Sequence, residues 1–430
     1  MLTAITGINW GDEGKGRMVD LLSQDYDIVC RYQGGNNAGH TVKNERGKFV
    51  LNLLPSGILR PNVVCVMGNG MVIDPHHLAG EIETLRSKGI AISPENLKIS
   101  DRATITMPYH VQQDGLEEAR LSKTGAQFGS TKRGIAYAYG DKYMKKTLRM
   151  GDLLHMDDSV HKRLETMVDS KNLVMEGSYG SAPISVDEMW AWLQTYADIF
   201  RDYICDVGEF LEKADDAGKK ILFEAQLGAL RDIDFGIYPY TTSSNVIGAY
   251  APIGAGVPGR KLSHSVGVMK AYSSCVGDGP FAAELAMTEE EKHALREAGH
   301  EYGAATGRPR RVGPIDLVAS RYGVSCQGCD EVALTLLDVL DYMEKIPVVT
   351  GYRLEDGSVT GRFPMGKALD TAQPVVEYLP GWHCDITACR TWEDLPQAAK
   401  DYVLYLEKAV GCSITYISVG AEREAYIHRT

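Results

Sequence analysis

Apolar positions follow two different periods along the first part of the chain. The runs at 2–7 (LTAITG) and 26–32 (YDIVCRY) are short and continuous, which is typical of buried strands. Between them, residues 15–24 place apolar side chains at helical spacing and predict an amphipathic helix. The chain therefore opens as strand, helix, strand.

The alternation continues to the end of the sequence. Residues 41–54 predict a β-hairpin around 44–47, and residues 158–217 have mostly helical period. The remaining predicted elements are a helix over 75–89 and strands at 63–68, 219–225, 331–340 and 414–420. This order predicts an α/β fold with a large, mostly parallel central sheet flanked by helices, and with inserted helical and β-hairpin lobes. Because the sequence has no repeat or long linker, residues 1–430 are expected to form a single large α/β domain with inserted subdomains.

Composition narrows the class of protein. Apolar residues make up 44 % of the chain and charged residues 24 %, as in ordinary globular proteins. The formal net charge of −12 disfavours nucleic acid and anionic membrane surfaces as partners. No segment approaches the roughly 18 continuous apolar residues that span a bilayer, and the first residues lack the basic start of a secretory signal. We therefore expect a cytoplasmic protein with no nucleic-acid or membrane partner.

The nine cysteines are odd in number and scattered, which predicts reduced thiols. Cys326 and Cys329 in CQGC, with Cys384 and Cys389, could together supply four metal ligands. A zinc ribbon, however, needs two close CxxC pairs. We interpret these four residues as buried, small apolar side chains.

The segment NWGDEGKGRMVDLL at 9–22 follows the first predicted strand. It does not match the common phosphate loop G-x-x-x-x-G-K-[ST], since Lys15 is followed by Gly16 and no hydroxyl is present to bind Mg²⁺. Its glycines still let backbone N–H groups approach a polyphosphate at the start of a helix. Asp12 is unusual there, because phosphates repel a carboxylate unless it binds a metal ion or moves a proton. Taken alone, the segment could equally be a tight strand-to-helix connection.

A second glycine-rich segment, RYQGGNNAGHT at 31–41, follows the second predicted strand. It carries Gln33, Asn37, His40 and Thr41. Taken alone, such a histidine is more often a surface or core residue than a catalyst. Loops that leave adjacent parallel strands converge at one edge of a sheet, so we expect Asp12 and His40 to face one substrate as an acid/base pair.

The two strings WGDEGKG and GGNNAGHT closely resemble the signatures of the adenylosuccinate synthetase family. The resemblance extends over nearly the whole chain. It includes LPSGIL, GNG, YHVQQD, RMGDL, DIDFGIYPYTTSSN, KAYSSCVGDGPF, GAATGRPRR, LDVLD, PGW and the final SVG. So many matches in the same order make chance similarity very improbable.

The resemblance implies a GTP-dependent ligase that joins IMP and L-aspartate to give adenylosuccinate, GDP and phosphate. In the family mechanism a base removes the N1 proton of IMP, and the 6-oxyanion takes the γ-phosphoryl group. The amino group of aspartate then displaces phosphate. Asp12 matches the base and a Mg²⁺ ligand, His40 matches the acid at the transferring phosphoryl group, and Gly39 would give its carbonyl to Mg²⁺.

The resemblance also implies the binding residues. Those that match the GTP site are Gly11, Glu13, Gly14, Lys15, Gly16, Arg17, Gly39, Thr41, Arg310, Asp338, Ser418 and Gly420. Those that match the IMP and aspartate sites are Asn37, Thr131, Lys145, Gln226, Leu227, Thr242, Ala304, Ala305, Thr306, Gly307 and Arg308. A homodimer is expected, with residues near Lys145 reaching the partner's site.

Four positions depart from the family pattern. An amide usually follows EGA near the reacting oxygen, whereas here Leu227 takes that place and Gln226 precedes it. Either the loop shifts so that Gln226 takes the role, or the site lacks that donor. Lys145 stands for an Arg that reaches the 5′-phosphate, which loses a bidentate contact. Leu336 stands for a Lys beside the guanine, which leaves the preference for GTP over ATP open, and Lys132 is added near the nucleotide phosphate.

Other functions remain open at this point. A related synthetase that acts on GMP or dGMP is the nearest one, because Gln226 and Leu227 would lie beside the purine's six-membered ring. A GTP-binding regulatory protein with the same fold would bind GTP without releasing aspartate-dependent phosphate. A plain structural protein gives no reason for two glycine-rich loops.

Overall fold

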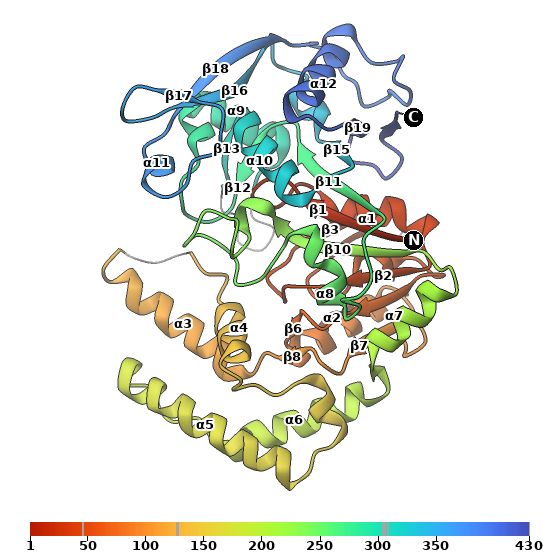
Figure 1. The fold of residues 1–430 in the computed structure, drawn as a ribbon, viewed down its shortest axis with the longest axis vertical. Coiled ribbons are helices and arrows are strands. Elements are labelled where there is room, and N and C mark those ends of the chain that lie inside the picture. Colours follow the sequence, from red (N-terminus) through yellow and green to blue (C-terminus); the bar gives the residue numbers. More distant parts are fainter. Residues whose placement is uncertain (45–46, 126–128, 303–306, 308, 430) are drawn as a thin grey trace.

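One large sheet organises the molecule (Figure 1). The structure, a computed structural model, describes residues 1–44, 47–125, 129–302, 307 and 309–429. Within them, ten strands pair in the order β20-β19-β15-β11-β1-β10-β2-β5-β7-β9, and only β20 runs antiparallel to its neighbour. The strands are β1 Leu2–Gly7, β2 Ile28–Arg31, β5 Val64–Met67, β7 Leu97–Ser100, β9 Ile204–Cys205, β10 Ile221–Gly228, β11 His264–Lys270, β15 Glu331–Thr335, β19 Ile414–Ser418 and β20 Tyr426–His428. The predicted mostly parallel sheet is confirmed.

The order of strands corrects one expectation. The two glycine-rich loops do not leave adjacent strands, because β10 pairs with both β1 and β2 and lies between them. The parallel direction still brings both loops to the same edge of the sheet. Side chains at the end of β10 therefore lie between the two loops.

Helices cover this sheet, and α3, α4, α5 and α6 gather in a lobe at the bottom of Figure 1. The start of α2 explains why the sequence predicts a helix there. The Asp74 side chain accepts the His77 N–H, and Pro75 occupies the first helical position. The described helices are α1 Lys15–Leu22, α2 Pro75–Ser87, α3 Pro108–Ser122, α4 Ile135–Tyr143, α5 Asp158–Tyr179, α6 Val186–Phe200, α7 Val207–Asp216, α8 Ala251–Ala255, α9 Glu289–Gly299, α10 Leu317–Gln327, α11 Lys367–Asp370 and α12 Gln397–Val410.

Smaller sheets extend the fold. The predicted hairpin is present as β3 His40–Asn44 and β4 Gly47–Leu51. A separate sheet consists of β14 Ile315–Asp316, β16 Lys345–Arg353, β17 Val359–Thr360 and β18 Gln373–Pro380. Of these strands, β16, β17 and β18 are labelled at the top of Figure 1. Two short pairs, β6 Val72–Ile73 with β8 Thr104–Ile105 and β12 Ser273–Cys275 with β13 Arg311–Gly313, complete the described strands. One core cluster joins β2, β5 and β7 to α2, α5 and α6, and another joins β11, β15 and β19 to α10 and α12.

Two expectations need correction. Residues 331–340 are not one strand, because β15 ends at Thr335, Leu336 takes a left-handed conformation (φ +60°), and Leu337–Leu340 form a 3₁₀ turn. The four cysteines of interest are not buried: Cys384 is exposed on the segment between β18 and α12, and Cys326, Cys329 and Cys389 are half-buried. Among the described residues, no helix combines the length and the apolarity that crossing a membrane requires.

Candidate active site

The first glycine-rich loop turns sharply between β1 and α1. Gly11, Asp12 and Gly14 have positive φ angles of 104°, 59° and 93°, and Gly14 caps α1 in the left-handed region. Aspartate tolerates this region better than most residues with a Cβ. The turn packs against the end of β10, since a Cβ added to Gly11 would lie 3.1 Å from Leu227 Cδ2. The loop therefore presents the Asp12 carboxylate, 35 % exposed, at the sheet edge.

Glu13 and Lys15 fix the inside of this loop. Glu13 Oε1 accepts the N–H groups of Asn9 (3.1 Å) and Gly11 (2.8 Å), and Glu13 Oε2 lies 2.6 Å from Lys15 Nζ. Burial alone would raise the pKa of Glu13, but the charge of Lys15 holds that pKa below its ordinary value. Both side chains are 2 % exposed, so Lys15 here pairs with Glu13 rather than pointing out of the loop.

His40 lies against the first turn of α1. A Cβ added to Gly16 would lie 2.7 Å from His40 Cβ, so only glycine permits this approach. His40 Nδ1 lies 2.5 Å from Glu224 Oε1, and the Ser56 hydroxyl and N–H donate to the same carboxylate at 2.6 and 2.7 Å. Burial alone would raise the pKa of Glu224, but the bond from His40 holds it below its ordinary value. An ionised Glu224 makes Nδ1 the donor of this bond, so Nε2 is the ring nitrogen that remains for another partner.

Asp12 is one end of a chain of charges. Asp12 Oδ2 lies 3.1 Å from Arg310 Nη2, and Arg310 Nη1 lies 2.8 Å from Glu301 Oε2. Lys270 Nζ (2.6 Å) and the Tyr272 hydroxyl (2.7 Å) bind the other oxygen of Glu301, which is 1 % exposed. Burial alone would raise the pKa of Glu301, but Lys270 and Arg310 lower it to about 2. The buried pairs keep Arg310 directed at Asp12.

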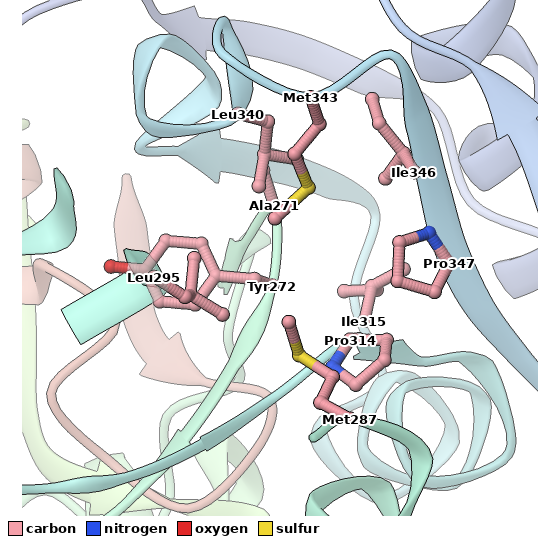
Figure 2. A pocket seen from close by; sticks show the side chains of 10 residues that line it. All are labelled: Ala271, Tyr272, Met287, Leu295, Pro314, Ile315, Leu340, Met343, Ile346 and Pro347. Carbon is pink, nitrogen blue, oxygen red and sulfur yellow. The ribbon is translucent and has the colours of Figure 1, made fainter. Parts of the chain in front are cut away.

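Tyr272 connects this series of charged residues to an apolar recess. Its ring lines a small recess with Met287, Leu295 and Leu340, and Figure 2 shows the hydroxyl directed away from the other lining side chains. The recess has no charged lining residue. It therefore supports the position of Glu301 rather than forming a polar ligand site.

The side chain of Gln226 lies inside the protein. Gln226 Oε1 accepts Arg31 Nη2 at 2.7 Å, and Gln226 Nε2 donates to Asn37 Oδ1. Arg31 is fully buried and also donates to the Gly35 carbonyl at 3.3 Å. Leu227 (φ +63°) turns the other way, toward Gly11. In this structure Gln226 thus holds Asn37 and the second glycine-rich loop, while Leu227 faces the first loop.

Replacing Gln226 by leucine is expected to lower the free energy of unfolding by about 1.5–3 kcal/mol, because a buried guanidinium loses its side-chain acceptor. Urea denaturation followed by circular dichroism measures the change. The matched control is Gln112→Leu, which removes an exposed amide that bonds Ser181 at 3.1 Å. Equal stability of the two variants would argue against the role of Gln226.

The candidate guanine site lies where α1, β15 and β19 meet. Arg17 Nη1 donates to Ser418 Oγ at 2.9 Å, and the Ser418 hydroxyl donates to the Gly420 carbonyl at 3.3 Å. Burial raises the pKa of Asp338, and Asp338 Oδ1 is a buried oxygen with no hydrogen-bond partner among the described residues. Such an oxygen needs a donor from elsewhere. Leu336 immediately precedes the 3₁₀ turn that carries Asp338.

The other predicted site residues are placed as follows. Gly39, Thr41 and Gly307 are exposed, and Thr242 is half-buried with its N–H donating to the Arg231 carbonyl at 2.8 Å. Thr131 is exposed before α4, and Lys145 is exposed after it with φ +63°. Ala304, Ala305, Thr306 and Arg308 lie outside the described residues.

Three buried charged residues were missed from the sequence. Glu224 and Arg31 stand inside apolar strands, and Glu301 precedes the Arg-rich segment. A charge in a buried strand is itself a signal, because it requires a partner of opposite charge or several hydrogen bonds. The partners themselves could not be named, because His40 and Glu224 are 184 positions apart.

The chain is similar to known proteins over nearly its whole length. The sequence model of the adenylosuccinate synthetase family matches residues 4–427. The adenylosuccinate synthetases of Caldanaerobacter subterraneus subsp. tengcongensis and Heliobacterium modesticaldum are 44 % and 45 % identical to the chain. The matches cover 99 % and 98 % of this chain, and 98 % and 97 % of theirs.

Solved structures are also similar to this chain. A fully ligated adenylosuccinate synthetase from Plasmodium falciparum superposes with a TM-score of 0.92 at 36 % identity, covering 100 % of this chain and 99 % of that one. A succinoaminodeoxyadenylate synthetase of cyanophage S-2L, bound to dGMP and dATP, shares only the fold, at 18 % identity and a TM-score of 0.59 over 99 % of this chain and 95 % of that one. The chain belongs to the adenylosuccinate synthetase family.

Proposed function

We propose that this protein is a GTP-dependent ligase that joins IMP and L-aspartate into adenylosuccinate, releasing GDP and phosphate. The observation that carries this proposal is the similarity to adenylosuccinate synthetases over 98–99 % of the chain. The two residues proposed for proton transfer, Asp12 and His40, are both present in this chain. The purine-nucleotide ligase is therefore the function that the fold and the site support best.

The chemistry follows from two side chains. The Asp12 carboxylate takes the proton from N1 of IMP, and the resulting 6-oxygen forms a bond to the γ-phosphorus of GTP while the bridging P–O bond breaks and GDP leaves. The amino group of aspartate then attacks C6, and the C6–O bond breaks with phosphate as the leaving group. His40 in its doubly protonated form keeps Nδ1–H on Glu224 and donates a hydrogen bond from Nε2 to the transferring phosphoryl group, where negative charge develops.

The binding residues are proposed in three groups. For GTP they are Gly11, Glu13, Gly14, Lys15, Gly16, Arg17, Gly39, Thr41, Arg310, Asp338, Ser418 and Gly420. For IMP they are Asn37, Thr131, Lys145, Gln226, Leu227 and Thr242, and for aspartate Ala304, Ala305, Thr306, Gly307 and Arg308. Since Lys15 pairs with Glu13, it reaches a phosphate only by exchanging that partner. Gln226 acts through Asn37, since both ends of its amide are bonded within the protein.

Magnesium fits this donor set. Among the described residues no three His, Cys, Asp or Glu side chains form a metal-binding group. Mg²⁺ is typically held by one or two protein oxygens together with substrate phosphates and water, so a single accessible carboxylate suffices. Asp12 is accessible and Gly39 is exposed, and these two would hold the ion. When bound, Mg²⁺ neutralises phosphate charge.

Phosphate release tests the function. IMP, aspartate, GTP and Mg²⁺ together are expected to release phosphate and shift the ultraviolet absorption of the purine, whereas omission of IMP or aspartate abolishes both signals. ATP in place of GTP tests the effect of Leu336, and GMP or dGMP in place of IMP tests the purine preference. GTP hydrolysis that ignores aspartate would overturn the proposal.

We also propose a homodimer, which the segment after α4 supports. Tyr143 and Met144 are 69 % and 58 % exposed beside Lys145, although both are apolar. Exposed apolar residues beside a proposed substrate residue fit a surface that a second chain covers. Sedimentation is expected to give the mass of two chains, and the double variant Tyr143→Asp/Met144→Asp to shift it toward one. Leu173→Asp, on another exposed apolar residue, is the control. A fully active monomer would contradict the dimer.

The cellular location is proposed as the cytoplasm. All nine cysteines are free thiols in the structure. Free thiols are typical of reducing compartments.

A further inference from the structure

The segment 129–134, called here the 129–134 loop, has an unusual backbone conformation, with one hydrogen bond inside it from the Lys132 N–H to Ser130 Oγ at 3.1 Å. Gly129, Lys132 and Gly134 all have positive φ angles, of 71°, 54° and 72°. A non-glycine residue such as Lys132 rarely adopts this region without support from its surroundings. The side chains of Thr131, Lys132 and Arg133 are exposed, so the loop presents a hydroxyl and two cations to solvent.

Two carboxylates of α3 accept hydrogen bonds from this loop. Asp114 Oδ1 accepts the Ser130 hydroxyl at 2.6 Å, and Asp114 Oδ2 accepts the Gly134 N–H at 2.9 Å. Glu118 Oε1 accepts the N–H groups of Gly129 (2.7 Å) and Ser130 (3.0 Å). Asp114 and Glu118 are four residues apart and therefore lie on one face of the helix. Each end of the loop is thus tied to α3 by a charged acceptor.

Both carboxylates are directed at the protein rather than at solvent. Asp114 is 7 % exposed and Glu118 is 9 % exposed. The end of the loop also packs closely on α3, because a Cβ added to Gly134 would lie 2.7 Å from the carbonyl carbon of His110. Neither carboxylate is placed to bind an anionic ligand directly. Their chemistry is that of acceptors for loop N–H and O–H groups.

We propose that Asp114 and Glu118 are positioning residues that set the shape of the 129–134 loop and thereby the affinity for the nucleotide substrate. This inference rests on the proposed function, in which Thr131 binds IMP. The two residues act through the loop and take no part in proton or phosphoryl transfer. Loss of their acceptor oxygens weakens nucleotide binding, whereas the reaction of bound substrate continues.

Asp114 accepts hydrogen bonds with both of its carboxylate oxygens, whereas Glu118 accepts with one. This difference allows the inference to be tested by substitution. Glu118 uses one oxygen for both of its donors, so Gln at this position keeps that acceptor, whereas Ala removes it. Glu118→Ala is expected to raise the KM for IMP about tenfold, with kcat within about threefold of wild type, and Glu118→Gln to restore the KM. Asp114→Ala is expected to raise the KM similarly. The matched control is Glu117→Ala on the same helix, whose carboxylate bonds Arg120 at 2.7 and 2.8 Å.

A second measurement does not depend on activity. Trypsin cleaves after Lys132 and Arg133, and loss of the acceptors is expected to speed this cleavage about tenfold in Glu118→Ala but not in Glu117→Ala. Unchanged KM and unchanged cleavage in both alanine variants at 114 and 118 would overturn the inference, as would a fall in kcat with a normal KM. If the wild type shows no IMP-dependent turnover, the proposed function fails, and the cleavage rates still decide whether the carboxylates hold the loop.

Discussion

Replacing His40 by asparagine is expected to lower turnover with IMP, aspartate and GTP by at least about a hundredfold, the usual scale of a general acid or base. The structure gives the reason. Nδ1 is bound to Glu224, which fixes the orientation of the imidazole and leaves Nε2 as the ring nitrogen for the proposed contact with the phosphoryl group. Asparagine retains a donor but cannot place a proton at the same point. Steady-state kinetics at saturating substrates measure the effect, with His293→Asn on the exposed face of α9 as control.

Glu224 supplies an internal check on that result. If the Glu224 carboxylate acts by orienting His40, then the single variant Glu224→Gln has a lower turnover than the wild type. The double variant Glu224→Gln/His40→Asn then has about the same turnover as His40→Asn alone. Residues that act as a unit are expected to be strongly non-additive in this way. Additive losses, or near-normal turnover of His40→Asn, would show that the pair does not serve phosphoryl transfer.

Local sequence pattern was sufficient for much of the fold. β1 and β2 are buried along their whole length, and a parallel strand that is buried on both faces has a continuous apolar sequence. The helix at 75–89 was readable because Asp74 and Pro75 are local start signals. The two glycine-rich loops follow these apolar runs directly, so the sequence alone places them at the ends of the two strands.

Contacts between residues far apart in the sequence could not be predicted from local patterns. The strand β10 enters between β1 and β2 from almost 200 positions later in the chain, and no local pattern specifies that pairing. The strand predicted at 331–340 was too long because Leu336, although apolar, takes a left-handed conformation that ends the strand. The sequence also left the role of Gln226 open, since the answer depends on the buried guanidinium of Arg31.

The position of β10 also explains how one strand serves both loops. Glu224 points to His40, and Gln226, two residues further along, points to Asn37. Residues two apart lie on the same face of a strand. Leu227 then turns toward Gly11 in the first loop. A shift of β10 by one residue would displace all of these contacts together, which makes this strand the common support of the proposed acid and base.

Replacing Asp12 by asparagine is expected to have an effect at least as large as that of His40→Asn, with turnover lowered at least about a hundredfold. An amide cannot accept the N1 proton. The fold is expected to persist, because asparagine tolerates the positive φ of this position and the half-exposed pair with Arg310 contributes at most about 1 kcal/mol. Arg310 also keeps its buried partner Glu301.

Kinetics can separate a chemical role of Asp12 from a binding role. If Asp12 is the base, kcat and kcat/KM for IMP fall together, whereas loss of binding alone raises KM and leaves kcat unchanged. The measurement is made at saturating Mg²⁺, because Asp12 is also the proposed magnesium ligand and a weaker metal site would otherwise imitate a loss of catalysis. Asp25→Asn, at an exposed position just after α1, is the matched control. Turnover of Asp12→Asn close to that of this control would mean that another group removes the N1 proton.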